Sequence, residues 1–68
     1  MQGVITNCFR AVLRDGPNLN AKPITVLTCL TEINVDLSKS DESFYYVIAS
    51  SGYEGFCLKR YVALKDRG

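Results

Sequence analysis

The sequence predicts an all-β fold, a small barrel of about five short strands, on three observations. β-Branched and aromatic residues alternate with polar ones along most of the chain, as they do in half-buried strands. Turn-forming residues separate these runs, most clearly at positions 15–17 (DGP) and 51–52 (SG). With 68 residues the chain is too short for a two-sheet sandwich, and closing one sheet into a barrel removes most unpaired strand edges. We therefore expect one domain over residues 1–68.

The N-terminal part predicts a long extended segment followed by a loop. Residues 4–13 begin rich in β-branched and aromatic side chains and continue extended. Glycine and proline stand side by side within residues 15–18, where glycine supplies an unusual φ angle and proline a fixed one, so we expect a turn. The loop continues to Lys22, and Pro23 closes it.

The next segment is ambiguous by periodicity alone. Ile24, Leu27 and Leu30 have the spacing of a helix face. Against a helix, four of the residues 24–28 are β-branched, Pro23 precedes them, and no clear cap is present. We therefore expect no regular helix here.

The C-terminal part predicts strands joined by short connections. Residues 38–43 are small and polar, which is typical of a solvated hairpin loop. Strands are expected at 44–49 and 53–57, with a tight turn between them, and at 61–64. The predicted core is Ile5 or Val4, Leu13, Ile24, Leu27, Ile33, Val35, Tyr45, Val47, Phe56 or Cys57, and Val62.

The composition is typical of a globular domain, with 47% hydrophobic residues and a formal net charge of +1. So small a charge implies neither a nucleic acid nor an anionic membrane as partner. No run approaches the ~20 apolar residues of a membrane span, and the N-terminus lacks the features of a signal peptide. If Met1 is the native start we expect a cytoplasmic protein, and otherwise a module of a longer, possibly exported, chain.

Three cysteines, Cys8, Cys29 and Cys57, cannot all pair within one chain. Their spacing lacks the close pairs that a structural zinc site needs, so we expect no bound metal. An unpaired cysteine behaves as a small buried hydrophobe. We therefore expect three free thiols in a reducing setting.

The chain offers little for catalysis because it has no histidine, the commonest general base and the usual partner of a cysteine or serine nucleophile. A thiolate at Cys57 would need stabilisation from Lys59 or Arg60. The carboxylates Asp41 and Glu42 lie in a serine-rich loop with nothing apolar nearby to raise a pKa. The sequence therefore predicts no enzyme, no catalytic residue and no cofactor.

Three segments resemble bacterial SH3 domains. Residues 12–17 (VLRDGP) are similar to their LNVRSGP segment, residues 44–47 (FYYV) to their W-Y-K-V strand, and residues 52–62 (GYEGFCLKRYV) to their last two strands. The match extends from Val4 to Leu64. The resemblance implies an SH3-like barrel with a short 3-10 turn near 58–60, and a role in binding.

The resemblance also implies a ligand groove on the surface. Phe44 matches the groove aromatic of SH3-type barrels, the closing Tyr61 lies beside it, and Tyr46 and Tyr53 could extend it. The loop at 15–20 and the acidic loop at 41–42 would form its walls. The alternative is that these aromatic residues simply cover a small core. The candidate groove residues are Phe44, Tyr46, Tyr53, Arg60 and Tyr61.

The chain also departs from the family pattern. Leu30 stands where the family has a turn glycine, which affects the local turn, and Phe44 replaces the usual tryptophan. Leu58 replaces the proline that shapes proline-binding pockets, so recognition of PxxP peptides is not expected.

The sequence favours a noncatalytic module that binds a peptide or a protein partner. One alternative is a module targeted to the peptides of peptidoglycan, because bacterial SH3 domains are often attached to cell-wall hydrolases. The other is a nucleic-acid-binding barrel. That alternative would use Lys59, Arg60, Lys65 and Arg67 with Tyr53 and Tyr61.

Overall fold

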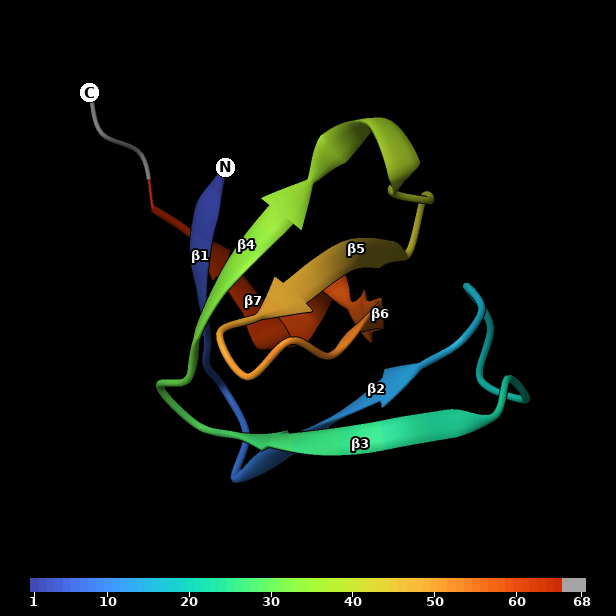
Figure 1. Cartoon of the computed structure of the whole chain (residues 1–68), viewed down its shortest axis with the longest axis horizontal. Helices are drawn as coiled ribbons and strands as arrows, with labels where there is room; N and C mark the ends of the chain where they lie inside the picture. The colour runs from blue at the N-terminus through green and yellow to red at the C-terminus, as the bar shows by residue number, and fades with distance from the viewer. Residues whose placement is uncertain (66–68) are drawn as a thin grey trace.

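The computed structural model describes residues 1–65, whose strands form one antiparallel sheet that curls around a small core (Figure 1). The strands lie in the order β3-β2-β6-β5-β4-β1-β7. The elements in chain order are β1 (Gln2–Ile5), β2 (Arg10–Arg14), β3 (Pro23–Thr28), β4 (Glu32–Asp36), the 3-10 turn η1 (Leu37–Lys39), β5 (Phe44–Ala49), β6 (Glu54–Leu58), the 3-10 turn η2 (Lys59–Tyr61) and β7 (Val62–Leu64).

The predicted all-β class is confirmed, but the sheet has seven strands rather than about five. Within residues 1–65 no pairing joins the edge strands β3 and β7, so the curled sheet is open and not a closed barrel. The 3-10 turns are the only helical structure in this part of the chain, and it contains no helix long and apolar enough to cross a membrane.

One of the additional strands arises because the extended segment expected over residues 4–13 is interrupted. Asn7 has a φ angle of 62°, a left-handed conformation that asparagine tolerates better than most residues. The chain changes direction there, so β1 pairs with β4 and β7, whereas β2 pairs with β3 and β6. This corner allows one run of sequence to join two distant parts of the sheet.

The segment with ambiguous periodicity is a strand, β3, as the β-branched residues indicated. The turn after it places Leu30 at a φ angle of 70°. The backbone therefore keeps the left-handed turn for which the family uses glycine, although a leucine occupies the position. A hydrogen bond of 2.7 Å from the Leu30 amide to the Ile5 carbonyl holds this turn against β1.

The two 3-10 turns differ in how well the sequence predicted them. The turn η2 begins one residue later than expected, at Lys59. The turn η1 was not expected, and Asp36 caps it by accepting hydrogen bonds from the Ser38 amide at 3.0 Å and the Ser38 hydroxyl at 2.6 Å. These hydrogen bonds hold the pKa of the Asp36 carboxyl below its ordinary value.

Every strand contributes to the core. Its largest fully buried side chains are Ile5, Leu13, Val35, Val47 and Cys57, all of which were among the predicted positions. Ile5 is therefore buried rather than Val4, and Cys57 rather than Phe56.

One predicted core position is wrong, because Ile24 is 39% exposed. The pairing register changes from Leu13 opposite Thr25 to Arg14 opposite Pro23, which leaves Ile24 without a partner in a bulge. An extra residue in a strand displaces its own side chain from the alternating pattern. Tyr45, also a predicted core residue, is only half-buried against the core. Two alanines that were not predicted, Ala11 and Ala49, are buried in the core.

A close approach at Gly55 brings β2 against β6. A Cβ atom at this position would collide with the Arg14 carbonyl oxygen and lie 3.1 Å from Leu13 Cγ. The only register pair joining the two strands is Arg14 with Phe56. Because glycine lets the backbones meet, the outer face of β2 lies beside the β5–β6 pair, where a cleft forms.

Candidate functional site

An aromatic cleft of about 250 Å³ lies between β2 and the β5–β6 pair. One wall comes from β2, the other from β5, β6 and η2, and the loop after β2 contributes one side chain. The residues that line this aromatic cleft are Arg10, Val12, Arg14, Leu19, Phe44, Leu58 and Tyr61.

Phe44 and Leu58 are register partners on β5 and β6, so their side chains lie on the same face of the sheet. Phe44 is only 5% exposed, yet it is not part of the main core cluster. It is therefore buried within the wall of the cleft. Hydrogen bonds from the Lys59 amide to the Ser43 carbonyl, at 3.0 Å, and from the Asp41 amide to the Phe44 carbonyl, at 2.7 Å, hold this region.

Tyr61 lies in η2, half-buried, with the buried Val62 directly after it. Its carbonyl accepts a hydrogen bond of 2.9 Å from the Thr6 amide, which ties η2 to the chain after β1. The Arg60 guanidinium carbon lies 6.0 Å from the centre of the Tyr61 ring, within the range of a cation–π contact. The ring is thus held in place while part of it stays accessible from the cleft.

The β2 wall follows from simple alternation. Ala11 and Leu13 are buried in the core, whereas Arg10, Val12 and Arg14 point to the other face and line the cleft. Arg14 Nη1 donates a hydrogen bond of 2.9 Å to the carbonyl of residue 21, which ties this guanidinium to the loop.

The cleft carries positive charge without a balancing carboxylate. Its lining includes two arginines and no acidic residue. Within residues 1–65 the ion pair is that of Lys65 with Glu32, at 3.5 Å, so neither Arg10 nor Arg14 is paired with an acid of this part of the chain. The acidic wall expected from residues 41–42 is absent from the lining, and the loop at 15–20 contributes only Leu19.

The structure brings together two of the five candidate groove residues, Phe44 and Tyr61. Arg60 does not line the cleft but lies against Tyr61, as described above. Tyr53 is 50% exposed in the turn before β6 and lies outside the lining.

Tyr46 is on the same face of β5 as Phe44 but is held away from the cleft. Its hydroxyl donates a hydrogen bond of 2.7 Å to Glu54, and its ring meets that of Phe56 edge to face at 5.2 Å. The ammonium of Lys39 lies 4.9 Å from the ring centre. The hydrogen bond to Glu54 raises the pKa of the Tyr46 hydroxyl. These contacts hold the Tyr46 side chain against β6 and η1.

Sequence reasoning did not name five of the lining residues as candidates, although one of them, Leu19, lies in the loop that was expected to form a wall. For those of β2 a signal was present, because an arginine, a valine and a second arginine alternate with Ala11 and Leu13. For Leu58 the departure from the family proline drew attention to the position without placing it in the cleft. The missed residues are Arg10, Val12, Arg14, Leu19 and Leu58.

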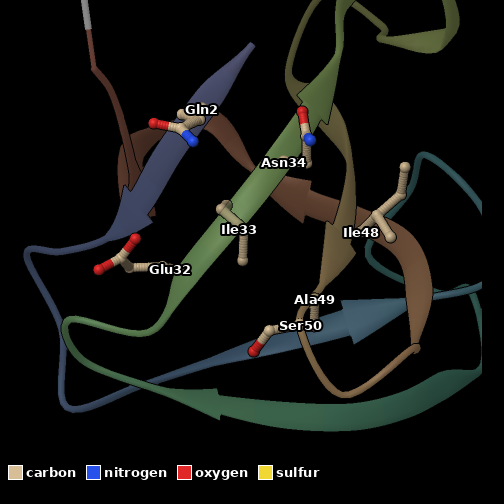
Figure 2. A pocket seen from close by; sticks show the side chains of 7 residues that line it. All are labelled: Gln2, Glu32, Ile33, Asn34, Ile48, Ala49 and Ser50. Atoms are coloured by element: carbon tan, nitrogen blue, oxygen red, sulfur yellow. The ribbon is translucent and has the colours of Figure 1, made fainter.

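A second hollow, of about 290 Å³, lies across β1, β4 and β5 and is wider open to solvent than the aromatic cleft. Figure 2 shows its polar side chains spread along the three strands rather than converging on one point. It has no aromatic lining, and its Glu32 is paired with Lys65. The aromatic cleft is therefore the stronger candidate site. The hollow is lined by Gln2, Glu32, Ile33, Asn34, Ile48, Ala49 and Ser50.

The three cysteines are free, and the surroundings of Cys8 and Cys57 do not activate their thiols. Burial raises the pKa of the Cys57 thiol to about 11, with a smaller contribution from Cys8, so Cys57 is protonated at neutral pH. Burial and the neighbouring Cys29 also raise the pKa of the Cys8 thiol. A nucleophilic cysteine needs the opposite shift. Within residues 1–65, no three acidic, cysteine or histidine side chains are grouped so as to hold a metal ion.

Two comparisons with known proteins bear on the family of this chain. A search of curated proteins found no significant match. The model of the bacterial SH3 domain family matches residues 10–63, a range that includes every residue of the aromatic cleft. Because this match covers most of the chain, the protein belongs to the bacterial SH3 domain family.

Proposed function

We propose that this domain is a noncatalytic binding module that holds a short peptide, or a segment of a partner protein, in the aromatic cleft. The observation that carries the proposal is the cleft itself, where Phe44, Leu58 and Tyr61 face Val12 between two guanidinium groups that form no ion pair with an acid of residues 1–65. Tyrosine and arginine are enriched among the residues that dominate binding energy at interfaces. Membership of the bacterial SH3 family supports binding rather than catalysis.

The size of the cleft favours a peptide over a larger small molecule. Its volume of about 250 Å³ is below the range of roughly 300 to 1,000 Å³ that is usual for drug-sized ligands. A few side chains of an extended peptide fit such a space, with the rest of the peptide lying on the surface. The peptides of peptidoglycan are one source of such a ligand.

The basic residues considered for nucleic-acid binding contact different partners and do not form one group. The Lys59 ammonium lies 4.9 Å from the centre of the Tyr45 ring, and Lys65 is paired with Glu32. Arg67 lies outside the described residues. This dispersal favours a peptide ligand over a phosphate backbone, which needs a continuous basic surface.

The test compares Tyr61→Ala with the control Tyr53→Ala, which removes an exposed tyrosine from outside the cleft. Wild type and both variants are used in parallel in a pulldown from bacterial lysate and in sedimentation with peptidoglycan. We expect Tyr61→Ala to weaken binding by about 1 to 3 kcal/mol, as for an interface aromatic, and Tyr53→Ala to leave it nearly unchanged. Equal binding by folded Tyr61→Ala and wild type would exclude the cleft as the site.

A further inference from the structure

On the outer face of β2, one apolar side chain lies between two positively charged ones. Arg10, Val12 and Arg14 are spaced by two residues, so their side chains leave the same face of the strand. At a rise of about 3.3 Å per residue, the two arginine Cα atoms are separated by roughly 13 Å. Val12 lies midway between them and faces the aromatic wall of the cleft.

Neither guanidinium is neutralised by an acid within residues 1–65. The single hydrogen bond that Arg14 makes to the carbonyl of residue 21 uses one of its five N–H donors and orients the group. Arg10 is exposed. A planar guanidinium recognises a carboxylate through two parallel hydrogen bonds, and an oriented one loses less conformational entropy on binding. Both guanidinium groups are therefore suited to bind a carboxylate of a ligand.

A ligand chain in extended conformation has the same rise per residue as β2. Two acidic side chains four residues apart in such a chain are separated by the same roughly 13 Å as the two arginines. The side chain midway between them points the same way, toward Val12, Leu58 and Tyr61. The spacing of the cleft thus matches a pattern of acid, any residue, apolar residue, any residue, acid.

We propose that the aromatic cleft binds an acidic segment of a partner protein in extended conformation, with two carboxylates flanking an apolar side chain. This inference rests on the proposed binding function and adds the chemical class of the peptide. A protein segment fits better than a nucleic acid because Val12, between the two arginines, is apolar, whereas a nucleic-acid backbone carries a negative charge at every nucleotide.

The experiment selects ligands from a random octapeptide library displayed on phage, with the wild-type domain immobilised. The consensus peptide is then synthesised, together with a version in which its acidic residues are replaced by their amides. Fluorescence anisotropy measures both peptides against wild type, Arg10→Gln, Arg14→Gln, Arg14→Lys and Tyr61→Ala. Lys65→Gln is the matched control, since it removes one positive charge from outside the cleft. Single-stranded oligothymidylate serves as a competitor.

We expect the selected peptides to carry paired acidic residues around an apolar one. Arg10→Gln and Arg14→Gln should each weaken binding about five-fold to twenty-fold, and Lys65→Gln less than two-fold. Arg14→Lys should retain part of the affinity, which separates loss of charge from damage to the loop. Affinity should also fall as NaCl rises from about 50 to about 300 mM.

Three results would overturn the inference. Selected peptides without excess acidic residues, or amide versions that bind equally well, would exclude it while leaving the proposed function intact if Tyr61→Ala still weakens binding. Displacement of the peptide by oligothymidylate at lower concentration would point to nucleic acid instead. If no selected peptide depends on Tyr61, the proposed function itself fails.

Discussion

Leu30 adopts a backbone conformation that glycine adopts more easily than any other residue. Its φ angle is 70° and its side chain is 72% exposed, so the side chain contributes little packing to offset the strain. We expect Leu30→Gly to raise the free energy of unfolding by about 0.5 to 1 kcal/mol, the relief of strain exceeding the extra chain entropy of glycine.

Urea denaturation of Leu30→Gly and Leu30→Ala tests this expectation. Alanine removes the same exposed apolar surface but keeps a Cβ atom, so Leu30→Ala should show no such gain. A stabilisation of equal size in both variants would attribute the effect to the lost side chain rather than to the backbone.

Cys57 should make the stability of the domain depend on alkaline pH. Its pKa is raised to about 11 in the folded state, above the ordinary thiol value near 9, because burial disfavours the thiolate. The folded state therefore holds the proton where the unfolded state releases it. The contribution of the protonated thiol to the free energy of unfolding is complete below about pH 9. It is lost as pH rises toward 11, and the free energy of unfolding falls by up to about 1.4 kcal/mol per pH unit.

Denaturant unfolding between pH 8 and 11 compares wild type with Cys57→Ala, in which this contribution is absent. The variant is less stable at neutral pH because it loses buried volume, but its stability should fall less steeply with pH. Parallel slopes for the two proteins would show that the thiol does not titrate between the two states as its burial indicates.

Individual residues were predictable where one local property decided their position. Leu13, Val35 and Val47 are buried as alternation alone assigns them to the inner face. Alternation also places Tyr46 beside Phe44, but it could not reveal the hydrogen bond to Glu54. That contact depends on the pairing register of β5 with β6, which the sequence does not encode locally.

At the scale of elements, the position of β2 depends on a glycine in another strand. A Cβ atom at Gly55 would overlap the Arg14 carbonyl oxygen, so Gly55→Ala must push β2 away from β6. We expect this substitution to lower the free energy of unfolding by about 3 kcal/mol, at the upper end of the range for overpacking a core. Binding through the cleft should weaken as well, because β2 forms one of its walls.

Gly16→Ala is the control for this effect. A Cβ atom at Gly16 would meet its nearest neighbour, in residue 21, at an ordinary distance of 3.4 Å. Thermal or urea unfolding should place Gly16→Ala within about 0.5 kcal/mol of wild type. A similar loss in both variants would mean that the general loss of glycine, and not the close approach of β2 to β6, is responsible.

Elements that pair locally were better predicted than those that depend on distant contacts. The turn at 51–52 and the strands on either side of it follow from glycine and alternation. The break between β1 and β2 does not, since it rests on one asparagine at a φ angle of 62° in an otherwise strand-forming run. Likewise η1 depends on Asp36 accepting a hydrogen bond from the Ser38 amide, a contact that the polar loop expected over residues 38–43 did not reveal.

Across the whole molecule, the family and the fold class were predictable because strand propensity and turn residues act over a few positions. That the sheet stays open was not predictable, because it depends on β2 meeting β6 and on whether edge strands far apart in the sequence pair with each other. The charge of the candidate site was misjudged for the same reason. The net charge of +1 gave no sign of a cleft whose lining, among residues 1–65, contains two arginines and no acid.

The most direct test of the account is an NMR titration of the isotope-labelled domain with the tightest peptide from the library selection. We expect amide shifts to cluster at the aromatic cleft, at Arg10, Val12, Leu58 and Tyr61. Amides of the second hollow, such as Asn34, should stay unchanged. Shifts centred on that hollow, or spread evenly over the surface, would contradict the claim that the aromatic cleft is the binding site.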